Sequence, residues 1–297
     1  MRTASRRCSC DTPGASSPCG ALAALDRAAH DSVGSLRSAA TSFRAPAVTA
    51  TPADHLATVR RHYRQALTTV ETVDRLFDLL HTRYDLAPHQ IVSADSICSD
   101  DVNSVEYPRR AYEMIGPFKM GGLNGFPFTG LTGMGAFASH VPADGAVFIY
   151  HAPHVGVSAD GSFGTIRRAG QQKPSGCCGA CRAALAKLQA GTLVAGVPDD
   201  MDYQQGTIEQ LFLAQRERIL SAPVPLYEAT EVMHEAITAR IDALAARTTY
   251  DARYLIVMGG ILINGDHDMG SFQCTRRLDV TDLRTGARED LRAQLLA

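Results

Sequence analysis

The sequence predicts an α/β fold with a mixed or mainly parallel central sheet flanked by helices. Short apolar runs typical of strands alternate along the chain with longer segments of helical periodicity, which is the pattern of α/β proteins. One of these runs, Tyr254–Asn264, is almost continuously apolar, as expected of a strand buried on both faces. The chain has 297 residues, of which 45% are apolar, so it can bury a sizeable core.

The first fifty residues differ in composition from the rest of the chain. They contain 6 Arg, 12 Ala and 8 Ser but only 3 Asp, and they have no Glu and no Lys. This acid-poor composition is that of an organelle transit peptide, or of a disordered tail that cannot fold alone. We therefore expect a leader over residues 1–52 and a single domain, beginning with a helical segment, over residues 53–297.

The first half of this domain is expected to begin with a helix and a strand. Thr51-Pro52 is typical of a helix entry, and apolar residues recur at three- and four-residue steps from Asp54 to Arg83, which predicts one amphipathic helix. The short apolar run Gln90–Cys98 predicts a buried strand. Gly116–Gly135 holds seven glycines, a density that disfavours any regular element.

Strand-like and helical segments alternate over the second half of the domain. The expected strands are Ala146–Tyr150, which Val155–Ser158 continues or follows, and Tyr254–Asn264. The expected helices are Cys178–Gln189, Gln204–Leu220 and Leu226–Arg247.

Composition and motifs exclude several classes of function. The formal net charge is −2 for the whole chain and −5 without the first fifty residues, so no nucleic-acid partner is expected. No window approaches 18 consecutive apolar residues, so no membrane-spanning helix is expected. The chain has neither a phosphate-binding G-x-x-x-x-G-K-[ST] loop nor the G-x-S-x-G elbow of serine hydrolases.

Reactive side chains concentrate in three segments that follow or border predicted strand ends. These segments are SICSDDVN (96–103), YHAPHVGVS (150–158) and SGCCGAC (175–181). Cysteine and histidine together suggest zinc, which takes thiolate and imidazole ligands, although these spacings match no compact zinc motif. The Cys178-Gly-Ala-Cys181 sequence at a helix start also fits a thioredoxin-like dithiol or half of a structural zinc site.

The ordered set of motifs resembles the limiting-CO2-inducible protein B/C family of algae and some microbes. The resemblance rests on SICSDDVN, GPFKMGGLNGFPFTGLTGMGAFASHVPADG, YHAPHVGVSADGSFG and RRAGQQKPSGCCGA, and more loosely on GGILIN near the C-terminus. It is strongest over residues 91–186 and implies a beta-carbonic-anhydrase-like α/β fold, commonly dimeric, with a zinc ion near the subunit interface.

The resemblance implies roles for individual residues of this chain. Cys98 and His154 match two zinc ligands, and the third is a cysteine of the adjacent pair, for which we choose Cys178 over Cys177. Asp100 matches the aspartate that either binds the zinc or pairs with an arginine.

One position departs from the C-x-D-x-R pattern of beta-type enzymes. The residue two positions after the aspartate is Val102, so another arginine must pair with Asp100. We choose Arg168 for this role. The alternatives are Arg167, Arg109 and Arg110.

The function implied by the resemblance is reversible zinc-dependent hydration of CO2 to bicarbonate. Phe126, Phe128 and Leu131 of the glycine-rich segment are expected to line an apolar slot for CO2. His140 or His151 is a candidate for carrying the proton to buffer, because imidazole titrates in the required range. The expected assembly is a homodimer or a hetero-oligomer with a paralogue, in the chloroplast stroma if the leader is a transit peptide and otherwise in the cytoplasm.

Two other functions stay open from the sequence. A catalytically weak protein of the same fold, binding inorganic carbon or acting as a scaffold, is favoured by the valine at position 102. A dithiol redox protein would use Cys178 and Cys181 and leave Cys98 and His154 without a role.

Overall fold

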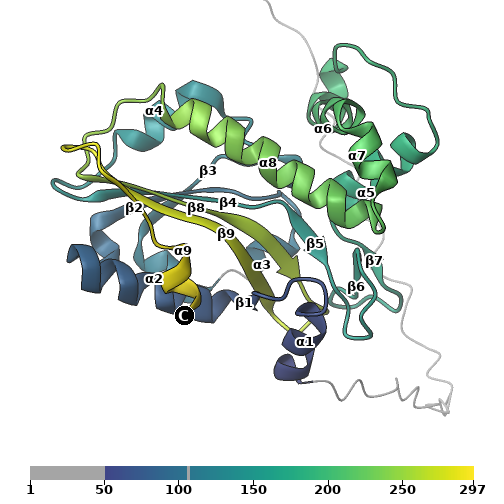
Figure 1. Cartoon of the computed structure of the whole chain (residues 1–297), viewed down its shortest axis with the longest axis horizontal. Coiled ribbons are helices and arrows are strands. Elements are labelled where there is room, and N and C mark those ends of the chain that lie inside the picture. The colour runs from purple at the N-terminus through teal and green to yellow at the C-terminus, as the bar shows by residue number, and fades with distance from the viewer. Residues whose placement is uncertain (1–50, 106–107) are drawn as a thin grey trace, which may run out of the picture. The chain divides into compact units, whose positions relative to one another are not determined.

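A computed structural model describes residues 51–105 and 108–297, and a mixed sheet forms its centre (Figure 1). The expected leader over residues 1–52 therefore lies almost wholly outside the described residues. The strand order is β1-β9-β8-β4-β2-β3, with β10 paired to β9 and β5 paired to β8, and β6 and β7 form a separate two-stranded sheet. The strands are β1 (Leu67–Thr68), β2 (Ile91–Ser96), β3 (Ile115–Lys119), β4 (Ala146–His151), β5 (His154–Gly156), β6 (Thr165–Ile166), β7 (Ser175–Gly176), β8 (Tyr254–Asn264), β9 (Ser271–Asp282) and β10 (Arg288–Asp290).

The centre of the sheet is parallel, which confirms the predicted fold class. Strands β3, β2, β4 and β8 run parallel to one another, and β5 extends the parallel pairing along β8. Ser96 of β2 lies opposite His151 of β4, which lies opposite Gly259 of β8, so the carboxyl ends of β2 and β4 reach the same edge. Strand β8 occupies the predicted range and is buried almost throughout.

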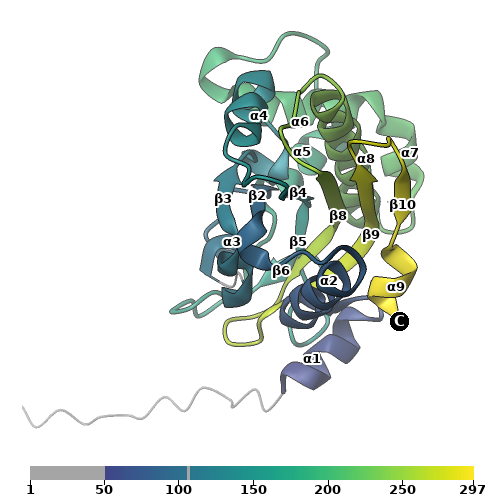
Figure 2. The same cartoon turned by 90° about the vertical axis from the view of Figure 1, so that its left-hand side faces the viewer.

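Helices cover both faces of the sheet (Figures 1 and 2). A first apolar cluster packs α4, α5, α6 and α8 against one face, and a second packs α2 and α9 against the other. The α-helices are α1 (Pro52–Val59), α2 (Thr69–Tyr84), α3 (Val102–Val105), α4 (Gly130–Ala138), α5 (Gly179–Gln189), α6 (Tyr203–Ala214), α7 (Arg216–Ser221), α8 (Pro225–Ala245) and α9 (Arg292–Leu296). Short 3₁₀ helices span Pro88–Gln90, Arg109–Glu113, Leu123–Gly125 and Asp200–Asp202. Among the described residues, no helix combines the length and the hydropathy needed to span a membrane.

The single helix predicted from Asp54 to Arg83 is wrong, because the chain forms two helices there. Thr51 caps α1 through a capping box with Asp54, and α1 ends at Val59. The chain then turns so that Tyr63 stacks against Tyr227, 5.1 Å between ring centroids, and β1 pairs with β9. Thr68 begins α2 by accepting a hydrogen bond from the backbone of Glu71. The apolar spacing runs through this turn because the turn itself buries Tyr63 and Ala66 in an apolar cluster.

The expectation of no regular element across Gly116–Gly135 is also wrong. Strand β3 occupies its first residues, and α4 begins at Gly130 and includes two further glycines. Burial of Met134 and Phe137 in the core outweighs the low helix propensity of glycine.

Two more segments differ from the prediction. The helix expected over Gln204–Leu220 breaks at Gln215 into α6 and α7, and the twelve-residue strand β9 was not predicted. Partly exposed Arg276 and Arg277 interrupt the apolar pattern of β9.

Candidate metal centre

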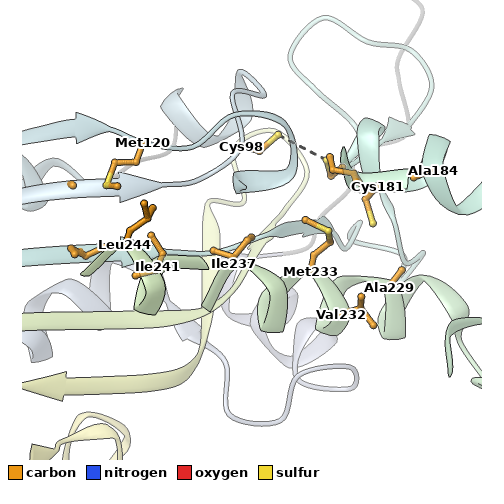
Figure 3. Close-up of a cluster of buried hydrophobic side chains, with 14 of the residues drawn as sticks. Cys98, Met120, Cys181, Ala184, Ala229, Val232, Met233, Ile237, Ile241 and Leu244 are labelled. Carbon is orange, nitrogen blue, oxygen red and sulfur yellow. Dashed lines mark hydrogen bonds between the residues drawn. The ribbon is translucent and has the colours of Figure 1, made fainter. Parts of the chain in front are cut away.

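Three chain segments bring cysteine and histidine side chains to the carboxyl edge of the parallel strands. Cys98 follows β2, His154 begins β5 just after β4, and Cys178 is the N-cap residue of α5. This edge is where open parallel sheets place their ligand sites. All three side chains are buried, and Figure 3 shows Cys98 and Cys181 among the side chains of the apolar cluster that α8 covers.

The three side chains are close enough to bind one metal ion. The candidate ligand atoms of Cys98, His154 and Cys178 all lie within 4.8 Å of one another. The two sulfur atoms of Cys98 and Cys178 are 3.9 Å apart. Two thiolates and one imidazole are a typical zinc ligand set, and three protein ligands leave one position open, as in catalytic sites.

A chain of amide groups fixes the orientation of the His154 ring. Its Nδ1 lies 2.7 Å from Oδ1 of Asn264, so Nδ1 donates a hydrogen bond to this acceptor. Asn264 in turn donates from Nδ2 to Asn103, 3.2 Å away, and Asn103 donates to the carbonyl of Cys98. Nε2 of His154 is buried and has no hydrogen-bond partner within the described part of the chain. This arrangement leaves the lone pair of Nε2 for a metal, so the residues fit a zinc ion.

Cys177 lies on the other side of the same imidazole ring. Its sulfur is 3.4 Å from Nδ1 of His154 and 3.5 Å from Oδ1 of Asn264, whereas Cys178 lies beside Cys98. Cys177 is fully buried and packs with Val102 and Ile166. Asp100, His154 and Cys177 also form a group within ligand reach of one another, so both adjacent cysteines approach the histidine. The choice of Cys178 as the ligand stays a prediction.

Arg168 binds the aspartate beside the cluster. Its Nη2 donates to both carboxylate oxygens of Asp100 at 2.9 and 2.8 Å, and its Nη1 donates to Ser175. Oδ2 of Asp100 lies 4.0 Å from Nε2 of His154. Burial alone would raise the pKa of Asp100, but hydrogen bonds to Asp101 and Arg168 outweigh it and hold this pKa below its ordinary value. Asp100 is therefore an ionised hydrogen-bond acceptor at neutral pH.

The other candidate arginines that have described contacts lie elsewhere. Arg110 pairs with Asp74 on α2, and the backbone N–H of Arg167 donates to Asp266. Val102, at the position where beta-type enzymes have arginine, is buried against Cys177. The arginine that contacts Asp100 thus comes from a distant segment.

The predicted apolar slot and proton carriers are placed as follows. The rings of Phe126 and Phe128 lie 5.1 Å apart, and Leu131 is partly exposed on α4. His140 is exposed, with Nδ1 2.7 Å from the carbonyl of Ala136. His151 is fully buried and stacks on His234, and burial lowers its pKa well below the ordinary value. Their roles stay predictions, although a fully buried His151 has no direct route to buffer.

Three asparagines around the cluster were not predicted. Asn103 and Asn264 form the amide chain described above, and the backbone N–H of Asn124 donates to the sulfur of Cys98 at 3.1 Å. One sequence signal pointed to Asn264, because it is the polar residue that ends the most apolar strand of the chain.

The CxxC cysteines do not have the environment of a reactive dithiol. Cys181 is buried in the apolar cluster, and burial raises the pKa of its thiol to about 12. A reactive cysteine is partly exposed and has a lowered pKa. The environment of Cys181 is that of a packing residue.

The fold and the buried cluster define a beta-carbonic-anhydrase-like α/β protein. The family model of limiting CO2-inducible proteins B/C beta carbonic anhydrases matches residues 67–282. The chain belongs to this family.

Solved structures of the family share the fold. The crystal structure of PtLCIB4, described as a homolog of the limiting CO2-inducible protein LCIB, has 30% sequence identity and a TM-score of 0.69, over 79% of this chain and 98% of that chain. The crystal structure of LCIB has 19% identity and a TM-score of 0.59, over 77% and 95% of the two chains, and shows the fold alone. No curated protein matches this chain.

Proposed function

We propose that this protein is a zinc-dependent carbonic anhydrase that reversibly hydrates CO2 to bicarbonate. The observation that carries the proposal is the buried cluster of Cys98, His154 and Cys178, in which Nε2 of His154 lacks a hydrogen-bond partner among the described residues. Arg168 engages both oxygens of Asp100, which leaves three protein ligands and one open position.

Different residues of the chain would have different roles in this reaction. Cys98, His154 and Cys178 would hold zinc, which when bound lowers the pKa of water to about 7 and so supplies a nucleophile at neutral pH. The ionised carboxylate of Asp100 would accept a hydrogen bond from that nucleophile and orient its lone pair toward CO2. Arg168 fixes the carboxylate in place, because its Nη2 donates to both oxygens of Asp100 while its Nη1 donates to Ser175.

Metal analysis and a hydration assay on the full chain test the proposal. We expect about one zinc per chain and CO2 hydration in stopped flow that a chelator removes and added zinc restores. Fully folded protein purified without any metal, or zinc-loaded protein without hydration activity, would contradict it. The second result would favour an inorganic-carbon-binding protein.

We also propose an assembly state and a location for this protein. The assembly is a homodimer, which light scattering of the purified chain tests. The location is the chloroplast stroma, which is tested by imaging the full chain and a chain lacking residues 1–50, each fused to a fluorescent protein.

Zinc affinity is expected to rise with pH. A hydrogen bond to Cys178, together with burial, raises the pKa of the Cys98 thiol, so this thiol is protonated at neutral pH in the metal-free protein. Zinc binds the thiolate and must displace that proton, so the apparent affinity should rise by about tenfold per pH unit for each proton released. Competition with a chromophoric chelator between about pH 6 and 8 measures this slope. A zinc affinity independent of pH would contradict the assignment of the Cys98 thiol as a ligand.

Removing the amide that orients His154 is expected to weaken zinc binding. Asn264→Leu deletes the acceptor for Nδ1, so the ring is free to rotate, and zinc affinity should fall by about 10- to 100-fold. Asn264→Asp keeps the acceptor for Nδ1 but loses the donor to Asn103, so zinc affinity should fall less than in Asn264→Leu in the same chelator competition. Equal losses in both variants would show that Asn264 acts through packing and not through this hydrogen bond.

A further inference from the structure

A cavity of about 50 Å³ lies on the α2 side of the sheet. Val73 and Leu76 of α2 line one wall, and Phe148, Met258 and Leu262 of the sheet line the opposite wall. These residues belong to or pack against the second apolar cluster, whereas Cys98 and Cys178 belong to the first. The candidate metal ligands are not among the described residues that line the cavity, so the cavity is separate from the proposed zinc site.

The described part of the lining is uncharged but contains an unsatisfied hydrogen-bond donor. Gln273 lines the cavity, and its Oε1 accepts a hydrogen bond from the hydroxyl of Tyr150 at 2.6 Å. Its Nε2 is buried without a hydrogen-bond partner among the described residues, and only 2% of Gln273 is exposed. A buried donor without a partner is costly, so a ligand that offers an acceptor atom gains from it. None of the described lining residues carries a charge, which disfavours carboxylates and bicarbonate.

The cavity also reaches the amide chain behind the metal cluster. Asn103 and Asn264 line it, and the same two side chains connect Nδ1 of His154 to the carbonyl of Cys98. A molecule in the cavity therefore contacts the groups that orient a candidate metal ligand, from the side opposite Nε2.

We propose that this cavity is a binding site for a small uncharged carbonyl compound. Its size fits a molecule of a few heavy atoms, because one water needs about 10–15 Å³ on the same measure. The apolar walls contact the body of the ligand, and Nε2 of Gln273 donates to its carbonyl oxygen. Acetone is a convenient probe of this class, to which CO2 also belongs.

Crystals and solutions of the full chain test the site with defined probes. Crystals pressurised with xenon should show density in the cavity, and crystals pressurised with CO2 test whether this member of the class enters it. In solution, acetone should show saturable transfer of magnetisation from the protein, and bicarbonate should not compete. Acetone bound while CO2 is absent from the cavity would support the site and identify its ligand as a larger carbonyl compound.

Two kinds of variant test separately the space between the cavity walls and the hydrogen-bond donor of Gln273. Val73→Phe and, independently, Ala111→Val reduce the space and should weaken acetone binding by about tenfold or more. Gln273→Met keeps the approximate shape but removes the Nε2 donor together with the Oε1 acceptor of Tyr150, so acetone binding should fall by about fivefold to tenfold while xenon still binds. Circular dichroism verifies that each variant is folded.

Three results would overturn the proposal. The first is that acetone binds unchanged to folded variants whose cavity is filled. The second is that xenon gives no density in the cavity. The third is that a side chain of a second copy occupies the cavity in the crystal. Acetone and xenon binding need no metal, so a failure of the proposed carbonic anhydrase activity would leave this test unaffected.

Discussion

Cys98→Ala is expected to abolish zinc binding and CO2 hydration while the chain stays folded. The sulfur of Cys98 lies 3.9 Å from that of Cys178 and belongs to the candidate ligand set, so its loss leaves two ligands. Hydration should fall by roughly 10³-fold or more, because the pKa of water without the metal stays far above neutral pH. Zinc content by mass spectrometry and stopped-flow hydration are the two measurements.

Cys181→Ala is the matched control for this variant. Cys181 is as deeply buried as Cys98, lies in the same apolar cluster and loses the same atom on substitution. Zinc content and hydration should stay close to wild type, with a loss of stability of about 1 kcal/mol. The dithiol hypothesis predicts the opposite result, because both cysteines of the CxxC sequence would be essential. Equal loss of activity in the two variants would therefore contradict the zinc proposal.

Short-range patterns revealed the strands that lead to the cluster, and the resemblance pointed to the residues in it. Continuous apolar runs predicted β2, β4 and β8, since a strand buried on both faces has no polar side. The two-helix start was not predictable, because apolar periodicity continues through the turn around Tyr63. Helix α1 ends because the chain after it makes contacts with distant residues, namely the stacking of Tyr63 on Tyr227 and the pairing of β1 with β9.

The surroundings of the cluster depend on contacts that no local pattern encodes. Asn103 and Asn264 are 161 positions apart and become neighbours only when β8 and α3 meet at the sheet edge. The resemblance left four arginines as possible partners of Asp100, and the structure gives the contact to Arg168, 68 positions away. The valine at position 102 favoured a weakly active protein, but the contact with Arg168 supplies the guanidinium that this position lacks.

Arg168→Ala is expected to keep zinc bound but to lose most of the hydration activity. Nη2 of Arg168 donates to both oxygens of Asp100, and Oδ2 of this carboxylate lies only 4.0 Å from Nε2 of His154. Without the guanidinium, the carboxylate is free to turn toward the metal and occupy the open position. Displacement of a positioned group by about 1 Å costs about 10²-fold in rate, so we expect a loss of at least that size.

The neighbouring Arg167 provides the control, and the absorption spectrum of a bound metal tests whether the Asp100 carboxylate binds it. Arg167 is exposed and contacts Asp266 through its backbone N–H, so Arg167→Ala should keep the wild-type rate. Arg168→Lys should fall between the two, because its one ammonium nitrogen cannot occupy the positions of both Nη2, which donates to Asp100, and Nη1, which donates to Ser175. In the cobalt-substituted protein, Arg168→Ala should change the visible absorption spectrum as a carboxylate oxygen joins the ligands, whereas Arg167→Ala should not. Full hydration activity in Arg168→Ala would show that the Asp100–Arg168 pair has no part in catalysis.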